Sequence, residues 1–230
     1  MNSRDILSYL PRPRIAEFPK GYTIYGAERP AEHLHLVISG CIRVFSTARD
    51  GRRLLLRIVS RDGLFGECAL IPADQAARQS AVALDQAQAM RWSAEDVRRR
   101  VESQPKLAVA LLEHLARSNC LLKERVKMLA SFATGPRVFF AVLQLAREAG
   151  VPRPDGSLRL IGLTHHAIAE YVGTSREIVT SEMNRLRHLG YVSYSRRHLD
   201  VFADAMTERQ QQEAGGARVA QEALGRAGTA

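Results

Sequence analysis

The pattern of apolar and polar residues divides the chain into a strand-rich first part and a helix-rich second part. From Phe18 to Trp92, short alternating or β-branched runs follow one another, separated by turns that contain glycine or proline. Such runs are typical of β-strands joined by tight turns. The expected strands comprise residues 22–25, 34–38, 41–46, 53–59, 80–84 and 88–92. This succession predicts a sandwich or jelly-roll barrel. Residues 1 to about 17 are basic and contain prolines, and we expect them to form a helical or irregular lead-in.

After the strand region, apolar residues recur at the spacing of a helix. Ser93 is a suitable N-cap for a short helix over residues 94–101, and Ser103 with Pro105 begins a longer helix that runs to about Ala133. The long helix carries a stripe with alternating steps of three and four residues, namely Ala108, Leu112, Leu115, Asn119, Leu122, Val126 and Leu129. This spacing is that of a coiled-coil seam.

Asn119 lies in the middle of this stripe and decides between two interpretations of it. A stripe that packs on its own barrel would bury the amide in an apolar core, which is unfavourable. Between two paired helices, a single polar residue of this kind selects the register. The sequence therefore favours a helix that pairs with a second copy of itself, and packing on the chain's own barrel is the alternative.

Two further helices joined by a tight turn are expected between Thr164 and Leu189. Thr164 and Ser175 are suitable N-caps, and Gly173 supplies the corner between the helices. The second helix has apolar residues at helical spacing, namely Ile178, Val179, Met183, Leu186 and Leu189. This arrangement predicts a helix-turn-helix motif, whose second helix enters the major groove of duplex DNA.

The segments around this motif predict a winged helix. Thr134-Gly135-Pro136 is expected to break the long helix, and a new helix follows over residues 137–149. A loop over residues 150–157 then leads to a strand over residues 158–161. After the helix pair, strands at residues 191–194 and 199–202 flank a basic turn and so form a hairpin.

The polar residues of the helix-turn-helix motif are candidates for contacts with DNA. On the second helix, the expected base-reading residues are Arg176, Glu177, Thr180 and Ser181. The expected phosphate contacts are Thr164, His165, His166, Ser175, Arg196 and Arg197. The alternative for the phosphate set is a solvated basic face with no ligand.

Composition agrees with a nucleic-acid partner. The chain has 33 Lys and Arg residues against 24 Asp and Glu residues, a net charge of +9, which suits a polyanion. Its three cysteines, Cys41, Cys68 and Cys120, are far apart and include no CxxC pair. This disfavours a disulfide framework, a zinc knuckle and an iron-sulfur cluster. No signal peptide or apolar run of membrane-spanning length is evident, so we expect a cytoplasmic protein without a membrane partner.

Over about residues 18 to 203 the chain resembles the cAMP receptor protein and fumarate-nitrate regulator (Crp/Fnr) family of bacterial transcription factors. The match is carried by three segments, residues 31–40 (AEHLHLVISG), 63–67 (GLFGE) and 174–179 (TSREIV). The resemblance implies an α+β fold with a cyclic-nucleotide-binding-like β jelly-roll barrel, a long dimerisation helix and a C-terminal winged helix-turn-helix. It also implies a homodimer that binds a palindromic promoter site and contacts RNA polymerase.

The expected boundaries follow this order of parts. The effector-sensing barrel domain covers residues 1–102, the dimerisation helix 103–133 and the DNA-binding domain 134–206. The dimer seam comprises Leu112, Leu115, Asn119, Leu122, Val126 and Leu129. Residues 207–230 are rich in Gln, Ala, Gly and Glu and are expected to be a flexible tail.

The resemblance also points to an effector pocket, at which the chain departs from the cAMP-responsive members. Its expected residues are Gly66, Glu67, Cys68, Arg78, Ser80, Leu122 and Lys123. Those members have an adjacent Arg-Ser pair for the phosphate, where this chain has Arg78-Gln79-Ser80. They read the adenine with Thr-Ser, where this chain has Leu122 and Lys123. Leucine donates no hydrogen bond, and an unpaired base edge costs about 1 to 3 kcal/mol. We therefore expect a small-molecule effector other than cyclic AMP, or none.

Other classes of sensor and protein remain as alternatives. An iron-sulfur sensor is disfavoured because residues 1–30 contain no cysteine, whereas His33, His35, Cys41 and Cys68 could provide an axial ligand to haem. Cys68 is the candidate for a thiol-based sensor.

An enzyme is not expected. A cupin-type metal site would need, besides His33 and His35, a glutamate three or four residues later and a further histidine in the barrel, and neither is present. A ligand-binding scaffold whose winged helix contacts protein instead of DNA is the last alternative. Salt-sensitive binding to duplex DNA separates a regulator from such a scaffold.

Overall fold

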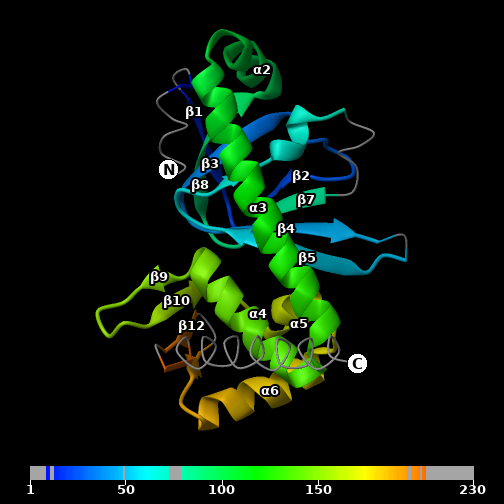
Figure 1. Ribbon diagram of the computed structural model, residues 1–230, viewed down its shortest axis with the longest axis vertical. Helices are drawn as coiled ribbons and strands as arrows, with labels where there is room; N and C mark the ends of the chain where they lie inside the picture. The colour runs from blue at the N-terminus through cyan, green and yellow to red at the C-terminus, as the bar shows by residue number, and fades with distance from the viewer. Residues whose placement is uncertain are drawn as a thin grey trace, which may run out of the picture.

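The computed structural model describes residues 9–10, 13–48, 50–72, 79–195, 198–202 and 204–205, and its first part is a barrel of two antiparallel sheets (Figure 1). The strands are β1 (Arg14–Phe18), β2 (Thr23–Tyr25), β3 (His33–Ser39), β4 (Ile42–Thr47), β5 (Arg53–Val59), β6 (Leu64–Phe65), β7 (Gln79–Ala83) and β8 (Ala87–Ser93). They form sheets with the orders β1-β8-β3-β6 and β2-β7-β4-β5. Apolar residues from both sheets, among them Phe18, Ile42 and Phe65, fill the space between them. The jelly-roll prediction is confirmed.

The expectation of a helical or irregular lead-in is wrong for β1. Residues 14–18 pair antiparallel with β8, from Arg14 opposite Arg91 to Phe18 opposite Ala87. β1 is an edge strand in which only Phe18 is buried. An edge strand of this kind lacks the regular alternation that marks a half-buried strand, so its pairing is decided by the neighbouring strand.

Two helices follow the barrel. Helix α2 (Ala94–Ser103) begins at Ser93, whose Oγ accepts a hydrogen bond from the Asp96 amide at 3.0 Å. Helix α3 (Pro105–Ser131) follows after Gln104, which is the N-cap of α3 but forms no side-chain capping bond. The assignment of Ser103 as the cap of the long helix is therefore wrong, because Ser103 ends α2. Pro105 begins α3, as expected for a residue without an amide hydrogen.

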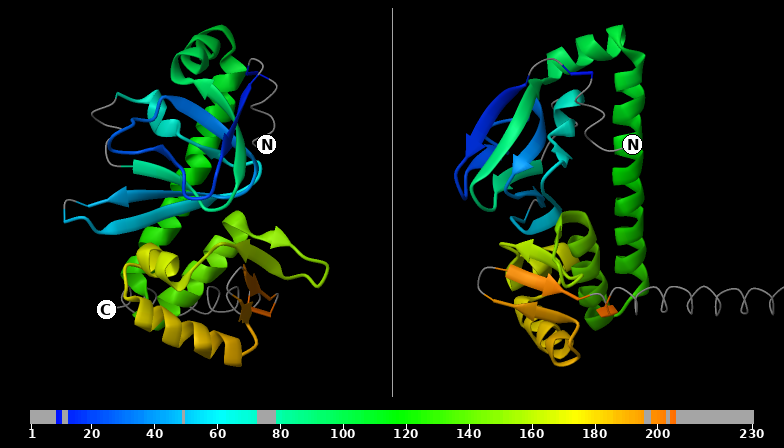
Figure 2. Two further views of the ribbon diagram at one scale, coloured as in Figure 1. Left: turned by 180° about the vertical axis from the view of Figure 1, so that it is seen from behind. Right: turned by 90° about the vertical axis from the view of Figure 1, so that its left-hand side faces the viewer.

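Helix α3 has one face on the two domains and another that no described residue covers. The views in Figures 1 and 2 show α3 running beside the barrel and on to the C-terminal domain, with both domains on one side of it. Leu107, Leu111 and Met128 are buried on this side. On the other face, Leu112 and Val126 are 67% and 65% exposed. The expected seam residues Leu115, Asn119 and Leu122 are also exposed, whereas Leu129 packs against the C-terminal core. Packing on the chain's own barrel therefore does not account for most of the stripe.

The C-terminal domain is a winged helix. It consists of α4 (Thr134–Ala149), β9 (Val151–Pro152), β10 (Leu158–Ile161), α5 (His165–Val172), α6 (Arg176–His188), β11 (Val192–Tyr194) and β12 (His198–Val201), with the sheet order β11-β12-β10-β9. Residues from α4, α5 and α6, among them Val142, Ile168 and Met183, form one core with the sheet. The α+β fold predicted from the sequence, with its barrel, long helix and winged helix-turn-helix, is confirmed.

Two local boundaries in this domain differ from expectation. Thr134-Gly135-Pro136 is the first turn of α4, and the chain changes direction just before it, at Phe132 and Ala133. A proline is tolerated in the first turn because no helical carbonyl awaits its missing amide hydrogen. The loop over residues 150–157 contains the short strand β9, which pairs with β10.

The barrel and the C-terminal domain share a hydrophobic core. Cys41, Leu55 and Ile58 of the barrel belong to the same buried cluster as α4 and α5. The contact therefore holds the helix-turn-helix motif against strand β5. Within the described residues, none of the helices combines the length and the apolar character needed to cross a membrane.

Candidate nucleic-acid interface and effector cavity

Local capping bonds define the two helices of the helix-turn-helix motif. Thr164 Oγ1 accepts a hydrogen bond from the Ala167 amide at 3.1 Å, and Ser175 Oγ accepts one from the Ile178 amide at 3.4 Å. Between them, Gly173 has a φ of 73° and ends α5 in the left-handed conformation. Both predicted caps and the glycine corner are confirmed, because each depends on residues only a few positions apart.

Helix α6 has one face buried in the domain core and another face exposed to solvent. Val179, Met183 and Leu186 are buried, whereas Ile178 and Leu189 are 44% and 50% exposed. Ile178 and Leu189, which were expected at the same helical spacing, therefore do not belong to the buried face. Ile178 directly precedes the buried Val179 and is turned away from it around the helix, and Leu189 is the C-cap that follows the last residue of α6.

The four expected base-reading residues are not equivalent. Arg176, Glu177 and Ser181 are exposed on α6. Thr180 is half-buried; its Oγ1 donates to the Arg176 carbonyl at 2.8 Å and lies 3.0 Å from His165 Nδ1. The structure thus engages the Thr180 hydroxyl within the domain and leaves the other three side chains accessible.

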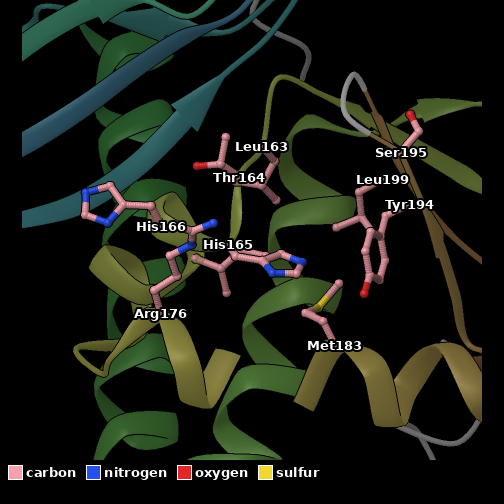
Figure 3. A pocket seen from close by; sticks show the side chains of 10 residues that line it. Leu163, Thr164, His165, His166, Arg176, Met183, Tyr194, Ser195 and Leu199 are labelled. Carbon is pink, nitrogen blue, oxygen red and sulfur yellow. The ribbon is translucent and has the colours of Figure 1, made fainter. Parts of the chain in front are cut away.

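A concave surface, which encloses a pocket of about 640 Å³, brings together the start of α5, the start of α6 and the wing strand β11 (Figure 3). It is lined by Leu163, Thr164, His165, His166, Ile168, Arg176, Met183, Tyr194, Ser195 and Leu199. Figure 3 shows the His165 ring directed toward Tyr194, while His166 points away from it. Three of the expected phosphate contacts therefore share one surface with a base-reading candidate, although the two groups are separated in the sequence.

The two histidines at this surface have different surroundings. Burial and the nearby Arg176 guanidinium lower the pKa of His165, which therefore favours the neutral form. Its ring packs edge-on against Tyr194 at a centroid distance of 5.1 Å. His166 is exposed, with its Nε2 3.5 Å from Glu170 Oε1. The neutral, internally bonded His165 suits a role in positioning α6, whereas His166 is accessible to a ligand.

Tyr194 also belongs to this surface, whereas two of the expected phosphate contacts lie outside the described residues. The Tyr194 hydroxyl donates to Asn184 Oδ1 at 2.8 Å and so connects the wing to α6. Tyr194 was not predictable from the sequence, since one tyrosine in a short strand gives no signal of a hydrogen bond to a residue ten positions away. Arg196 and Arg197, expected to contact phosphates, lie outside the described residues.

A second cavity, of about 460 Å³, lies between the barrel, α3, α4 and α5. Of the expected effector-pocket residues, Glu67, Cys68 and Leu122 line it. Gly66 directly precedes Glu67 and has a φ of 83°, and a side chain there would bring a Cβ within 2.4 Å of the His33 carbonyl oxygen. A glycine is therefore required at this turn.

The remaining expected effector-pocket residues are not brought into the cavity. Ser80 does not line it, and its hydroxyl lies beside Gly26, while Lys123 points away as an exposed residue of α3. Ser80 and Lys123 therefore do not belong to the described wall of the effector pocket, contrary to expectation. Neighbouring positions on a strand or helix face different directions, and Gln79 and Leu122 line the cavity instead. Arg78 lies outside the described residues.

Two features of the described cavity residues differ from those expected of a cyclic-nucleotide site. Glu67, the candidate partner for a ribose hydroxyl, accepts from Arg57 Nη2 at 2.5 Å. Most of the remaining wall is apolar and includes Val44, Leu56, Leu70, Ile71, Leu115, Leu121 and Leu122. Leu122, at the position expected to meet the base, has no hydrogen bond to donate to the polar edge of that base. The apolar part of the wall is suited to the apolar part of a ligand.

Cys41, Cys68 and His35 of the barrel are buried. Burial and the nearby Asp85 carboxylate raise the pKa of Cys41 to about 11, and burial and Glu67 raise that of Cys68. Both favour the thiol, whereas reactivity and metal binding need the thiolate. Burial lowers the pKa of His35 to about 3, and its ring stacks on Phe65 at 4.6 Å. In the described part of the chain, no three His, Cys, Asp or Glu side chains are grouped as metal ligands would be.

The barrel, the long helix and the winged helix define a DNA-binding regulator with a separate sensing domain. Residues 15–104 match the model of the cyclic nucleotide-binding domain, and residues 136–203 match that of the Crp-like helix-turn-helix domain. The chain belongs to the Crp/Fnr family of transcription regulators. It is therefore a transcriptional regulator with a DNA-binding domain, in a family of regulators and not of enzymes.

Curated relatives and a solved structure agree with this assignment. The chain is 30% identical to the CRP-like cAMP-activated global transcriptional regulator of Mycobacterium tuberculosis, over 76% of this chain and 78% of the relative. It is 27% identical to the global nitrogen regulator of Synechococcus elongatus, over 82% and 86%. FixK2 from Bradyrhizobium japonicum has the same fold, with a TM-score of 0.74 and 19% identity over 87% of this chain and 97% of that one. Regulators with a Crp-like helix-turn-helix bind DNA and typically act as dimers.

Proposed function

We propose that the protein is a homodimeric regulator that binds a palindromic promoter site with its two α6 helices. The observation that carries this proposal is the exposed start of α6, with Arg176, Glu177 and Ser181 beside the concave surface formed by α5 and the wing. Arginine can donate two hydrogen bonds to guanine, and glutamate can accept one from cytosine. The capped N-terminus of α6 carries a partial positive charge that favours approach to the DNA backbone.

The proposed dimer forms through the uncovered stripe of α3. Leu112, Leu115, Leu122 and Val126 are 67%, 43%, 50% and 65% exposed in the single chain. An apolar row of this length on one helix is unfavourable in water, and a second copy supplies a matching row. Asn119 within the row fixes the register of the two helices.

The residues around α6 position the domain on the DNA backbone. Thr164, His166 and Ser175 are accessible at the starts of α5 and α6. Arg196 and Arg197, which lie outside the described residues, complete the proposed set of phosphate contacts. His165 and Thr180, bonded to each other, act indirectly by fixing α6 against α5. Such contacts set orientation and affinity and leave sequence selection to the base-reading residues.

We propose that a small molecule other than cyclic AMP controls the regulator by binding in the cavity of about 460 Å³ that Glu67 lines. We also propose that the protein acts in the cytoplasm, where the DNA-bound dimer contacts RNA polymerase. The apolar wall and the Glu67–Arg57 pair support this assignment of the effector. Because the cavity touches the barrel, α3 and the DNA-binding domain, a ligand there would contact all three parts of the switch.

The test is DNA binding by the full chain. An operator selected from random duplexes is titrated at several salt concentrations, and a logarithmic slope of about −0.9 per phosphate contact is expected. Arg176→Ala should weaken operator binding by about 1 to 3 kcal/mol and relax the choice at one base position. Lys106→Ala, at the exposed start of α3 far from α6, is the control. A loss that is equal on every sequence would remove Arg176 from base reading, and salt-insensitive or absent binding would favour the scaffold alternative.

A further inference from the structure

Arg125 is a buried cation that no described carboxylate pairs with. It lies on the inner face of α3 and is 4% exposed. Nη1 donates to the Leu56 carbonyl at 3.0 Å, and Nη2 donates to the Tyr171 carbonyl at 2.6 Å. Nε has no partner, and none of the ion pairs found in the described residues includes Arg125. A buried charge is costly without an opposite charge, so the site is suited to an anion.

The acidic residues on the cavity wall form no ion pair with Arg125. Glu148 lines the same cavity from α4, but its Oε1 accepts from Gln144 Nε2 at 2.9 Å. Burial raises the pKa of Glu148 and so favours its neutral form. Arg57 and Glu67, which also line the cavity, neutralise each other. The Arg125 guanidinium also lies over the Tyr171 ring, 3.9 Å from its centroid, and Glu148 acts on it electrostatically. Among the described residues, however, no carboxylate forms an ion pair with Arg125, and its Nε has no hydrogen-bond partner.

The rest of the cavity restricts what the anion can be. Its volume of about 460 Å³ lies in the range of small-molecule sites, and most of its wall is apolar. Leu115 and Leu122 belong both to this wall and to the exposed stripe of α3, so a partner helix would close that side. Inorganic phosphate would leave the apolar wall unused, and a neutral hydrocarbon would leave Arg125 unpaired.

We propose that this cavity binds a small organic acid with an apolar body, whose carboxylate pairs with Arg125. This inference rests on the proposed regulator function and specifies its effector. A carboxylate that takes the guanidinium competes with the Leu56 and Tyr171 carbonyls. Tyr171 is in the last turn of α5, and Gly173 follows as the corner before α6. Occupancy therefore alters how the helix-turn-helix motif is held against β5, and DNA binding responds.

The first experiment titrates the full-length protein with straight-chain carboxylates from hexanoate to decanoate and with the primary alcohols of equal length, by calorimetry. Affinity should rise about fourfold per methylene until the cavity is filled. Each carboxylate should bind at least about tenfold more tightly than its alcohol, because an ionised acceptor forms the stronger bond with a guanidinium. Equal affinities would overturn the role of Arg125, and so would cyclic AMP binding that none of the carboxylates displaces.

Three variants separate the charge from the cavity. Arg125→Gln should remove the preference for carboxylates over alcohols and keep the dependence on chain length. Ser118→Trp, which fills the cavity from α3, should weaken both series, whereas Lys127→Trp on the exposed face of the same helix should weaken neither. Thermal unfolding monitored by circular dichroism identifies any variant that fails to fold. If Arg125→Gln fails to fold, the comparison of Ser118→Trp with Lys127→Trp still tests whether the ligands bind in this cavity.

The second experiment measures operator affinity with and without saturating decanoate. A change of at least about fivefold is expected for the wild-type chain, in the range of allosteric coupling, and none for Arg125→Gln. An unchanged affinity in the wild-type chain would overturn the coupling. Operator binding without any binding of carboxylates would overturn this inference alone, whereas absence of DNA binding under all conditions would overturn the proposed function.

Discussion

Replacing Leu112 by alanine tests whether the uncovered stripe of α3 is the dimer interface. Leu112 is 67% exposed in the single chain, so most of its side chain is available to a partner. The substitution removes about three carbons, each worth about 0.8 kcal/mol when buried. Scaled by the exposed fraction of 67%, the loss is about 1.6 kcal/mol per protomer and about 3.2 kcal/mol per dimer, since a two-fold interface uses each residue twice. The dimer dissociation constant should rise about 200-fold.

Sedimentation equilibrium over a range of protein concentrations measures this change directly. Val109→Ala is a matched control, because Val109 is an apolar residue on the same helix with 51% exposure but lies outside the stripe. It should shift the dissociation constant by less than about threefold, since it removes apolar area that no partner covers. Operator binding at low protein concentration should weaken with Leu112→Ala alone. Equal effects of both substitutions, or a monomer at all concentrations of the wild-type chain, would refute the assigned seam.

Three further predictions concern the barrel and the recognition helix. Gly66→Ala should lower the melting temperature clearly, because its Cβ would lie 2.4 Å from the His33 carbonyl oxygen in a left-handed turn; an unchanged melting temperature would show that the turn adapts. Burial lowers the pKa of His35 to about 3, so the folded state resists its protonation and stability should fall as the pH drops below about 6.5, at up to about 1.4 kcal/mol per pH unit. Urea unfolding of His35→Phe should show a flatter profile over this range, and identical profiles would exclude His35 as the cause. Thr180→Val removes the hydroxyl that bonds His165 and should weaken binding to all operators equally in a competition assay, whereas an altered base preference would make Thr180 a direct reader.

Features that depend on short-range interactions were predictable from the sequence. The caps at Thr164 and Ser175 and the corner at Gly173 involve atoms a few residues apart, so the chain order specifies them. The long helix and its stripe were predictable for a similar reason, since a repeat of three and four residues can only place its members on one face. The strands with clear alternation followed from the same kind of periodicity.

Features that depend on which elements meet were not predictable. Arg125 gives no sequence signal of its own, because its partners Leu56 and Tyr171 lie 69 and 46 residues away on other elements. The edge strand β1 exists because β8 offers it hydrogen bonds, and not because its own residues alternate. The positions of Ser80 and Lys123 were not predictable either, because both are next to cavity residues in the sequence but do not line the cavity.

The sequence by itself therefore determined the class of the protein, the order of its parts and the helix that we propose reads DNA. These follow from local propensity, periodicity and capping, which act over a few residues. The tertiary structure decided which side chains are free to act. It engages Thr180 with His165, leaves Arg176, Glu177 and Ser181 accessible, and places the buried charge of Arg125 at the junction of both domains. Accessibility and charge pairing depend on contacts between distant segments, and only the packed fold brings those segments together.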